Sequence, residues 1–427
     1  MASLTKLTSK YLAWLPELRR EIWILAAGQL LLYIGQGFTL VYASIYFVNE
    51  LGFSPTQVGL ALGSAGISGT LGRFWAGNAV ESQRLGRRGT LLLAAVIAAL
   101  GSFSLAFAYT FPLLIAGNML LGLGISLYWP ATMAATIDLT EPEHRTEAIA
   151  LTRLADNLGL GLGALLAGQY IAMSGSYPIL FICKGVAYLV FAGVIFRMIP
   201  ETRPVPTVPL DMLKNWRQAL GDRHLVTYLT ANLFFTTYTA QLSSTLPLYL
   251  ANYIPAGNTD TGFSEQIISY FFVWHAALKI ALQLPITRWL RPVSHITVLL
   301  ASLGLWSFAL LAIWLVGFVS SYALMVALLA FALVALAEIL YGPTASTLMG
   351  EIAPEHLRGV YFSLDSQCWA IGFLIGPALG GWALDHPDVL GTNLWLALVS
   401  SSAIAGTILL ILRGQLTVDA QQYEGET

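Results

Sequence analysis

Long apolar runs constrain the fold of this chain more than any other feature. A helix needs about 20 mainly apolar residues to cross the hydrocarbon core of a bilayer. Twelve stretches of the 427-residue sequence have this length, and they lack the two-residue alternation of half-buried strands. Each is therefore predicted to be a transmembrane helix. The predicted spans are 22–47, 56–79, 89–108, 111–137, 146–172, 178–199, 224–252, 265–289, 295–318, 321–350, 358–384 and 390–413.

The composition points to the same environment. Hydrophobic residues make up 56% of the chain and charged residues only 10%, whereas an average soluble domain has about 25% charged residues. A soluble protein of this size could not cover its surface with so few charges, so we expect a polytopic protein that has the lipid bilayer as its main partner. The net charge of -2 gives no basic excess, and nucleic acid is therefore not expected as a partner.

The placement of lysine and arginine predicts the orientation. Cytoplasmic loops of membrane proteins carry an excess of these residues. In this chain they gather in the N-terminal segment, after the even-numbered spans and at the end of the last span, while the connections on the opposite side carry none. We therefore expect a multi-pass protein of the plasma, or inner, membrane with both termini in the cytoplasm.

The longest polar break, residues 200–222, separates the spans into two sets of six. Its four prolines argue against one continuous helix. The predicted organisation is a cytoplasmic N-terminal segment (1–21), an N-terminal bundle (22–199), a cytoplasmic linker (200–222), a C-terminal bundle (223–413) and a cytoplasmic tail (414–427).

The two sets of spans also resemble each other in sequence. A constant offset of 213 residues aligns charged residues, prolines, tyrosines and glycines of spans four and five with those of spans ten and eleven, and a weaker match joins spans one and seven. Two related six-helix halves predict a cavity between them and alternating access by rocking one half against the other. The aligned pairs include Tyr128 with Tyr341, Pro130 with Pro343, Asp138 with Glu351, Arg145 with Arg358 and, at the other offset, Asn49 with Asn252.

The loop after span two has the sequence GNAVESQRLGRRGT, residues 77–90. It resembles the signature of the major facilitator superfamily, in which a glycine, three residues, an acid and a base precede a Gly-Arg-Arg triplet. The resemblance implies an all-α membrane protein of twelve transmembrane helices in two pseudo-symmetric six-helix halves. The matching residues are Gly77, Glu81, Arg84, Gly86, Arg87 and Arg88, with Arg84 in the base position after two extra residues.

In that family the loop acts as a conformational latch on the cytoplasmic side. The acid lies near the start of helix eleven, where the positive end of the helix dipole favours a carboxylate. Asp138 and Arg145, which flank the loop after span four, are assigned to the same latch. The alternative is a loop that carries positive charge and has no latching role.

A glycine-rich pattern ending in Gly-Pro-x-x-Gly-Gly resembles a feature of the drug:proton antiporter branch, where it usually lies on helix five. Here the complete pattern lies on span eleven, and span five has an incomplete form. Asn118 on span four stands where antiporters carry an arginine. Close helix packing, which small residues at four-residue spacing promote, is the favoured interpretation of the span-eleven residues Gly372, Gly376, Pro377, Gly380 and Gly381.

Several ionisable residues fall inside the predicted spans. Each costs about 2.5–3.5 kcal/mol at the centre of a bilayer, so such groups usually face a cavity or a partner. We expect Lys279 to pair with Glu338 or Asp365, either as a proton-coupling switch or as a permanent structural ion pair. Lys184 is expected to extend toward the membrane interface. The proton-coupling candidates are Glu338, Lys279, Asp365, His275, Arg153 and Asp156, of which the last two can pair locally.

Neutral polar and aromatic residues form stripes on spans one, four and seven. Such a lining suits an uncharged or amphipathic organic solute, with hydrogen bonds that orient it. The alternative is hydrogen bonding between helices without contact to a solute. The cavity candidates are Gln29, Tyr33 and Gln36 on span one, Tyr128 and Trp129 on span four, and Asn232, Thr236, Thr239 and Gln241 on span seven.

The sequence has no P-loop and no HExxH motif. We therefore expect neither an enzyme nor a metal site, and no cofactor other than a proton gradient as the driving force. The combined prediction is a monomeric secondary transporter that couples protons to the efflux of small amphipathic compounds. The alternative is a proton symporter or uniporter that imports a neutral metabolite such as a sugar.

Overall fold

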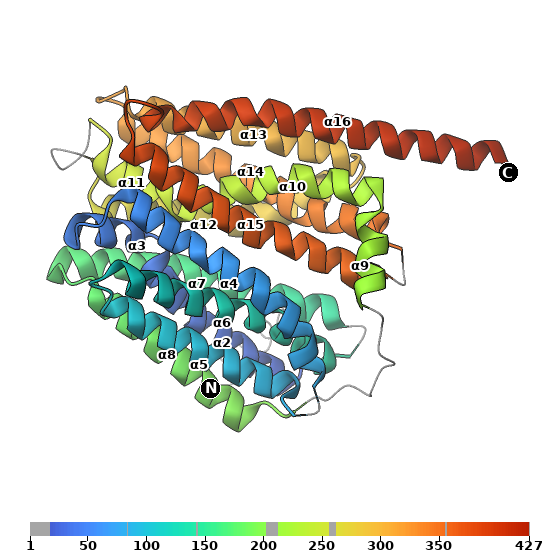
Figure 1. The fold of residues 1–427 in the computed structure, drawn as a ribbon, viewed down its shortest axis with the longest axis horizontal. Coiled ribbons are helices and arrows are strands. Elements are labelled where there is room, and N and C mark those ends of the chain that lie inside the picture. The colour runs from blue at the N-terminus through green and yellow to red at the C-terminus, as the bar shows by residue number, and fades with distance from the viewer. Residues whose placement is uncertain are drawn as a thin grey trace, which may run out of the picture.

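The computed structural model describes residues 18–82, 84–141, 144–201, 212–255, 262–354 and 357–426. The regular structure in these ranges is helical (Figure 1). The helices of the first half are α2 (Arg20–Leu40), α3 (Tyr42–Ile45), the π-helical turn η1 (Tyr46–Glu50), α4 (Pro55–Glu81), α5 (Gly86–Ala106), α6 (Phe111–Asp138), α7 (Arg145–Ser174) and α8 (Pro178–Met198).

The second half repeats this arrangement after a short connecting helix, α9 (Met212–Leu220). Residues 202–211 of the predicted linker lie outside the described residues. The helices that follow are α10 (Arg223–Ser243), α11 (Thr245–Asn252), α12 (Glu265–Trp289), α13 (His295–Val316), α14 (Ala323–Ile352), α15 (Arg358–Asp385) and α16 (Leu394–Glu426).

The predicted fold class is confirmed, because α2–η1 and α10–α11 each form one interrupted span and ten further long helices complete the two sets of six. Among the described residues, ten spans are long and apolar enough to cross a membrane. The helices α4 and α10 are not among the ten, since glycine and serine are frequent in α4, and threonine, asparagine and glutamine in α10. A strict hydropathy criterion thus misses helices whose polar side chains bond to backbone carbonyls of the same helix or to neighbouring helices.

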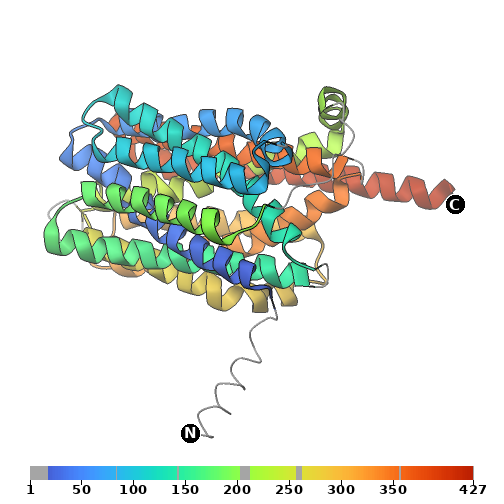
Figure 2. The ribbon, with the colours of Figure 1, turned by 90° about the horizontal axis from the view of Figure 1, so that it is seen from below.

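Local sequence explains several helix ends. Ser54 and Gln57 form a reciprocal capping box at the start of α4, with Pro55 in the first turn. The carboxylate of Asp222 accepts a hydrogen bond from the backbone N–H of His224 and caps α10. Gly175 ends α7 with a φ of 65°, a conformation that glycine adopts without strain. Helix α16 continues past residue 413, where the last span was predicted to end, and extends beyond the other helices (Figure 2).

The two halves lie side by side, one coloured blue to green and the other yellow to red in Figure 1. The helices α4 and α15 pack together across the boundary, as do α7 and α12. Glycines permit the first contact: a Cβ atom at Gly63 would lie 2.7 Å from the carbonyl oxygen of Leu374, and Gly59 and Gly66 also meet the backbone of α15. The backbones approach closely at these positions, as in other small-residue helix pairs.

In the described part of the chain, hydrogen bonds between the halves gather at the end where α3 and α11 meet. The amides of Asn49 and Asn252 bond to each other reciprocally, at 3.0 and 2.6 Å. The hydroxyl of Thr56 donates to the Asp385 carboxylate at 2.6 Å. The Tyr42 hydroxyl of α3 donates to the backbone carbonyl of Glu265 at the start of α12. These bonds hold the halves together at one end of the molecule.

Candidate functional site

Three of the predicted intramembrane ionisable residues meet on one carboxylate. The Oε2 atom of Glu338, on α14, lies 2.8 Å from Lys279 Nζ and 3.1 Å from His275 Nε2. Lys279 and His275 are one turn apart on α12, so they present both nitrogen atoms on the same face. The Glu338 side chain is only 10% exposed. We call these residues the α12–α14 triad.

Asp365, the other acid that the sequence offered as a partner for Lys279, lies in a separate network. Its Oδ1 atom accepts hydrogen bonds from Asn232 Nδ2 at 2.8 Å and from the Tyr228 hydroxyl at 3.1 Å. The Tyr341 hydroxyl in turn donates to Asn232 Oδ1 at 2.6 Å. This network joins α10, α14 and α15, and Asp365 is satisfied there by neutral donors.

In the first half, Arg153 and Asp156 do not form an ion pair with each other in the part of α7 that the structure describes. The Arg153 guanidinium lies over the ring of Trp129, 4.6 Å from its centroid, in a cation–π contact. Asp156 is 6% exposed, and its Oδ1 atom has no hydrogen-bond partner among the described residues. A buried carboxylate oxygen without a partner is unfavourable unless water or a ligand reaches it.

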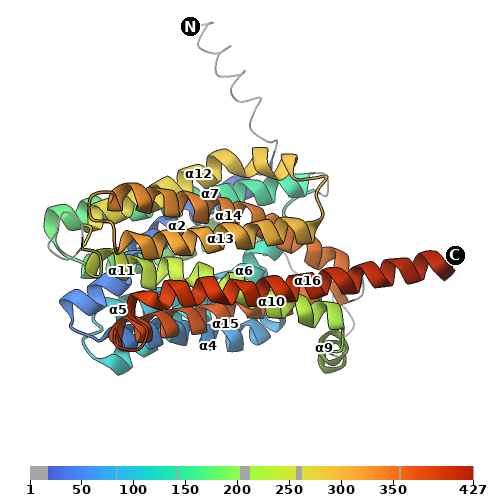
Figure 3. The same cartoon turned by 90° about the horizontal axis from the view of Figure 1, so that it is seen from above.

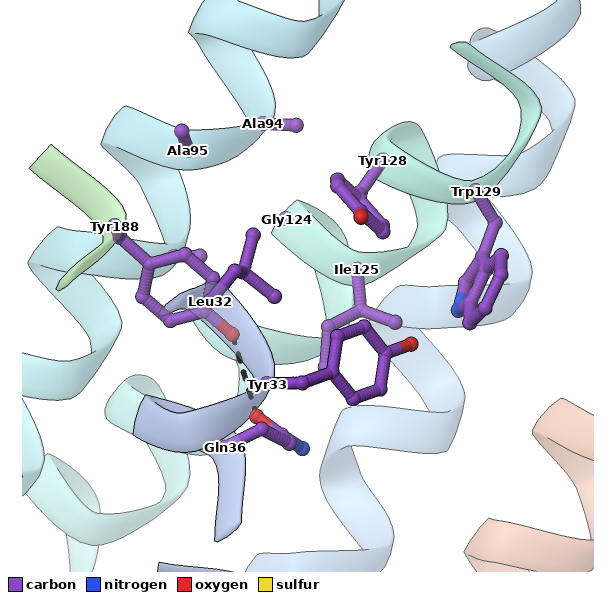
Figure 4. Close-up of a pocket in the computed structure, with 11 residues that line it drawn as sticks. Leu32, Tyr33, Gln36, Ala94, Ala95, Gly124, Ile125, Tyr128, Trp129 and Tyr188 are labelled. Carbon is purple, nitrogen blue, oxygen red and sulfur yellow. Dashed lines mark hydrogen bonds between the residues drawn. The ribbon is translucent and has the colours of Figure 1, made fainter. Parts of the chain in front are cut away.

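An aromatic cavity of about 100 Å³ lies between α2, α5, α6 and α8 (Figure 4). Tyr33 and Gln36 of α2 and Tyr128 and Trp129 of α6 line it, together with Tyr188 of α8. The Tyr188 hydroxyl donates to Gln36 Oε1 at 3.3 Å. Four cavity candidates from the sequence therefore line one hollow.

Gln29 and Tyr188 add two observations on the surroundings of this cavity. Gln29, two turns before Gln36 on α2, is 1% exposed and its Oε1 atom lacks a hydrogen-bond partner in the described part of the chain. Tyr188 was not among the candidates from the sequence. It lies four residues after Lys184 on α8, so the two polar side chains share one helix face, and this spacing was the available signal.

The polar stripe of α10 bonds mainly to α15. Thr236 donates to the Cys368 carbonyl and Gln241 donates to the Gly376 carbonyl, each at 3.0 Å. Thr239 bonds within its own helix, to the Phe235 carbonyl. The structure thus places three of the α10 candidates, Asn232 included, in contact with α15.

The glycines of α15 make room for these bonds. A Cβ atom at Gly376 would lie 2.7 Å from the Ala240 Cβ, and one at Gly372 would lie 2.7 Å from the Thr236 backbone. A Cβ atom at Gly380 would likewise meet the Thr245 side chain. One at Gly381 would meet the backbone of Pro55, in α4 of the other half, and the Pro377 carbonyl faces Gly59 of α4 in the same contact. One glycine-rich helix thus packs within its half and across the boundary.

A family profile described as Major Facilitator Superfamily matches residues 25–257 and 251–421, which together span most of the chain. The chain belongs to the major facilitator superfamily. Members of this superfamily are membrane transporters rather than enzymes, and the long apolar helices agree with a multi-pass membrane protein.

Among curated superfamily relatives, the multidrug resistance protein MdtH of Salmonella typhimurium is 27% identical over 360 residues, which cover 83% of this chain and 84% of MdtH. MdtH of Salmonella newport matches to the same extent. Among solved structures, the nucleoside transporter NupG has a TM-score of 0.75 at 12% identity and covers 92% of this chain and 99% of its own. A POT family transporter in complex with 5-aminolevulinic acid has a TM-score of 0.74 at 14% identity, with 92% and 94% covered. These two likenesses show the fold alone.

The superfamily loop after α4 bonds within the first half where the structure describes it. Arg87 Nε lies 3.0 Å from Asp138 Oδ2 at the end of α6, and its Nη1 donates to the Val80 carbonyl. The backbone N–H of Arg87 donates to Glu201 Oε1 at 2.8 Å, and Gly86 has a φ of 65° at this turn.

The remaining latch candidates divide into three groups. Arg88 donates to the Phe196 carbonyl and its guanidinium lies over the Phe196 ring. Arg84 and Arg145 are exposed. The side chain of Glu81 and the surroundings of Gly77 lie outside the described residues. The described contacts therefore join α4, α5, α6 and the end of α8, and the latch role stays a prediction.

Lys184 of α8 does not extend to the membrane interface, and that expectation was wrong. Its side chain points inward, with the residue 2% exposed, and Nζ donates to the Thr39 hydroxyl of α2 at 2.8 Å. Gly35 of α2 lies directly against it, since a Cβ atom there would be 3.2 Å from the Lys184 Cα. The absence of a side chain at Gly35 lets the lysine lie between the helices.

Proposed function

We propose that this superfamily transporter couples the movement of protons to the export of small amphipathic organic compounds. The observation that supports proton coupling is the α12–α14 triad, in which the buried carboxylate of Glu338 bonds to both Lys279 and His275. Protonation of Glu338 would remove the negative charge that holds Lys279, and a change of this kind biases an element that has two arrangements.

Helix α12 connects the triad to the boundary between the halves. Residues of its first part pack on α7: the side chain of Ser269 faces Gly168, and Ala276 lies next to Gly161. A change in how α12 is held by α14 would therefore alter the contact that α12 makes with the opposite half. Rocking of the halves is the expected mode of alternating access in this fold.

The aromatic cavity supports an amphipathic solute. Its lining of tyrosine, tryptophan and glutamine offers ring faces and neutral hydrogen-bonding groups but no arginine or lysine. Its volume of about 100 Å³ is smaller than the 300–1,000 Å³ of typical small-molecule sites, so it would hold one ring or substituent. The relatives named for multidrug resistance support export.

A proton symporter or uniporter that imports a neutral metabolite such as a sugar is the second candidate. Asn118 of α6 supports it, because this neutral residue stands where antiporters of the branch carry an arginine. Its amide donates to the Leu114 carbonyl of the same helix at 2.8 Å. In both cases the proposal includes a monomer in the inner membrane with cytoplasmic termini, a proton gradient as the driving force and no bound cofactor.

Reconstituted liposomes that contain a pH-sensitive dye test the proposal. A proton gradient is imposed, and lipophilic cations, neutral drugs and sugars are added in turn to wild type and Glu338→Gln. We expect solute-dependent proton flux in wild type that vanishes in Glu338→Gln and persists in Glu351→Gln, a carboxylate variant outside the triad. The direction of flux separates antiport from symport. Solute movement without proton flux would contradict coupling and favour a uniporter.

A further inference from the structure

A second cavity, of about 220 Å³, lies within the second half, at the point where α12 ends and α13 begins. The helices α12, α14 and α13 can be followed in Figure 3. The last turn of α12, the connection to α13, the first turn of α13 and the second half of α14 supply its walls. The lining residues are Thr287, Leu290, Arg291, Val293, His295, Val298, Ile339, Pro343, Thr344 and Thr347.

The second part of α12, which borders the cavity, is less covered than its first part. The buried residues of α12 end at His275, and the part from residue 276 onward is only partly covered. Toward its end the helix exposes large apolar side chains, with Leu284 at 65% and Trp289 at 78%. In a membrane protein, such residues face lipid, and tryptophan is enriched at the level of the head groups.

The cavity is lined by both apolar and polar side chains. Leu290, Val293, Val298 and Ile339 belong to a small hydrophobic cluster that is separate from the main core. Thr344 and Thr347 contribute hydroxyl groups from α14, the helix that also carries Ile339. An amphipathic occupant matches this mixed lining better than a free ion does.

The charge at the cavity favours an anion. Arg291 is exposed and makes no ion pair within the ranges that the structure describes. Helix α13 begins at His295, so its first backbone N–H groups and the positive end of its dipole lie at the cavity. The carboxylate of Glu351 also approaches, with its Oε2 atom 3.0 Å from His295 Nδ1.

We propose that this cavity binds the head group of an anionic phospholipid, with the phosphate at Arg291 and the start of α13 and the glycerol and upper acyl chain on the apolar cluster. Basic cavities between transmembrane helices are suited to anionic head groups. Such a lipid would fill the gap beside α12, the helix that also carries Lys279 and His275. The site is distinct from the aromatic cavity and does not depend on the transported solute.

Native mass spectrometry of the full chain tests the proposal, with added phosphatidylglycerol or phosphatidylcholine of equal chain length. We expect phosphatidylglycerol to bind more tightly. Arg291→Gln should weaken the binding of phosphatidylglycerol about fivefold and leave the binding of phosphatidylcholine unchanged. Arg197→Gln, an exposed arginine in the last turn of α8, is the matched control and should change neither.

Three outcomes would overturn the proposal. An equal loss in Arg291→Gln and Arg197→Gln would indicate general surface charge. Displacement of phosphatidylglycerol by equimolar inorganic phosphate would indicate a site for free anions. Thr347→Phe, which fills the cavity and keeps Arg291, should also release the lipid, and unchanged phosphatidylglycerol binding in this variant would place the lipid elsewhere.

Discussion

In the C-terminal half, the buried carboxylate of Glu338 is held by Lys279 and His275, whereas in the N-terminal half the buried carboxylate of Asp156 has an oxygen without a hydrogen-bond partner in the described part of the chain. Lys184 of the N-terminal half likewise has only the Thr39 hydroxyl as a partner there. A buried charged group whose hydrogen-bonding atoms all have partners in the protein needs no further ligand. A group that lacks such partners remains available to water, protons or a solute.

The internal repeat makes this comparison sharper, because it relates individual residues. Tyr128 and Tyr341 are aligned by the 213-residue offset. The Tyr341 hydroxyl donates to Asn232, but the Tyr128 hydroxyl, beside the aromatic cavity, has no partner among the described residues. The tyrosine of the second half therefore makes a short hydrogen bond, whereas Tyr128 lies beside Gln29 and Thr132 without a hydrogen bond of normal geometry in the described part of the chain.

The largest effect is expected for Glu338→Ala. The change leaves Lys279 in a mainly buried position without its carboxylate, and breaking a buried ion pair costs about 3–5 kcal/mol. Thermal unfolding in detergent should show the loss. A double variant, Glu338→Leu with Lys279→Met, should recover most of the stability, because it removes both charges. Equal instability of the single and double variants would show that the triad is not an ion pair of this kind.

Asparagine substitutions at Asp365 and Asp156 should show the next largest difference in stability between the two halves. Asp365→Asn weakens charge-assisted hydrogen bonds from Asn232 and Tyr228 and should reduce the free energy of unfolding by about 1.5–3 kcal/mol. Asp156→Asn should leave that free energy unchanged or raise it, because it neutralises an incompletely bonded carboxylate. Chemical denaturation of both variants measures the difference, and a larger loss in Asp156→Asn would reverse the comparison.

The repeat-related tyrosines give a matched pair of variants. Tyr341→Phe leaves the carbonyl of the Asn232 side chain without its donor, which should cost about 1–3 kcal/mol of stability. Tyr128→Phe should cost less than about 0.5 kcal/mol, since no hydrogen bond of normal geometry is lost. The two midpoints of thermal unfolding are compared directly. Similar losses of stability in both variants would mean that the Tyr128 hydroxyl also makes a stabilising hydrogen bond.

A small effect is expected at both members of the last pair, Asp138 and Glu351, which the repeat places at the ends of α6 and α14. Asp138 pairs with Arg87, and Glu351 pairs with the more exposed His295, both at 3.0 Å. Asp138→Asn should cost up to about 1 kcal/mol and Glu351→Gln less, because exposed pairs contribute little. Unfolding curves at low and high salt measure both, and a Glu351 effect above that of Asp138 would contradict the expectation.

Much of the architecture could be predicted from the sequence, because apolar length and basic loops are local properties. The four-residue spacing of His275 and Lys279 also placed them on one face. The choice of Glu338 over Asp365 could not be predicted, since it depends on how α12 and α15 pack around α14. The inward position of Lys184 depends on Gly35 in another helix. The α10 stripe looked like a solute lining, but Thr236 and Gln241 bond to α15, and no local pattern distinguishes these two uses.

The paired amides at the end where α3 and α11 meet have an evolutionary consequence. Asn49 and Asn252 are repeat-related, and each donates to and accepts from the other. A contact of one residue with its own counterpart is what a two-fold symmetric dimer makes. In a dimer of six-helix chains, a single asparagine position would supply both donors and both acceptors of this bond. In this chain two separate positions supply them, so either asparagine can change without the other.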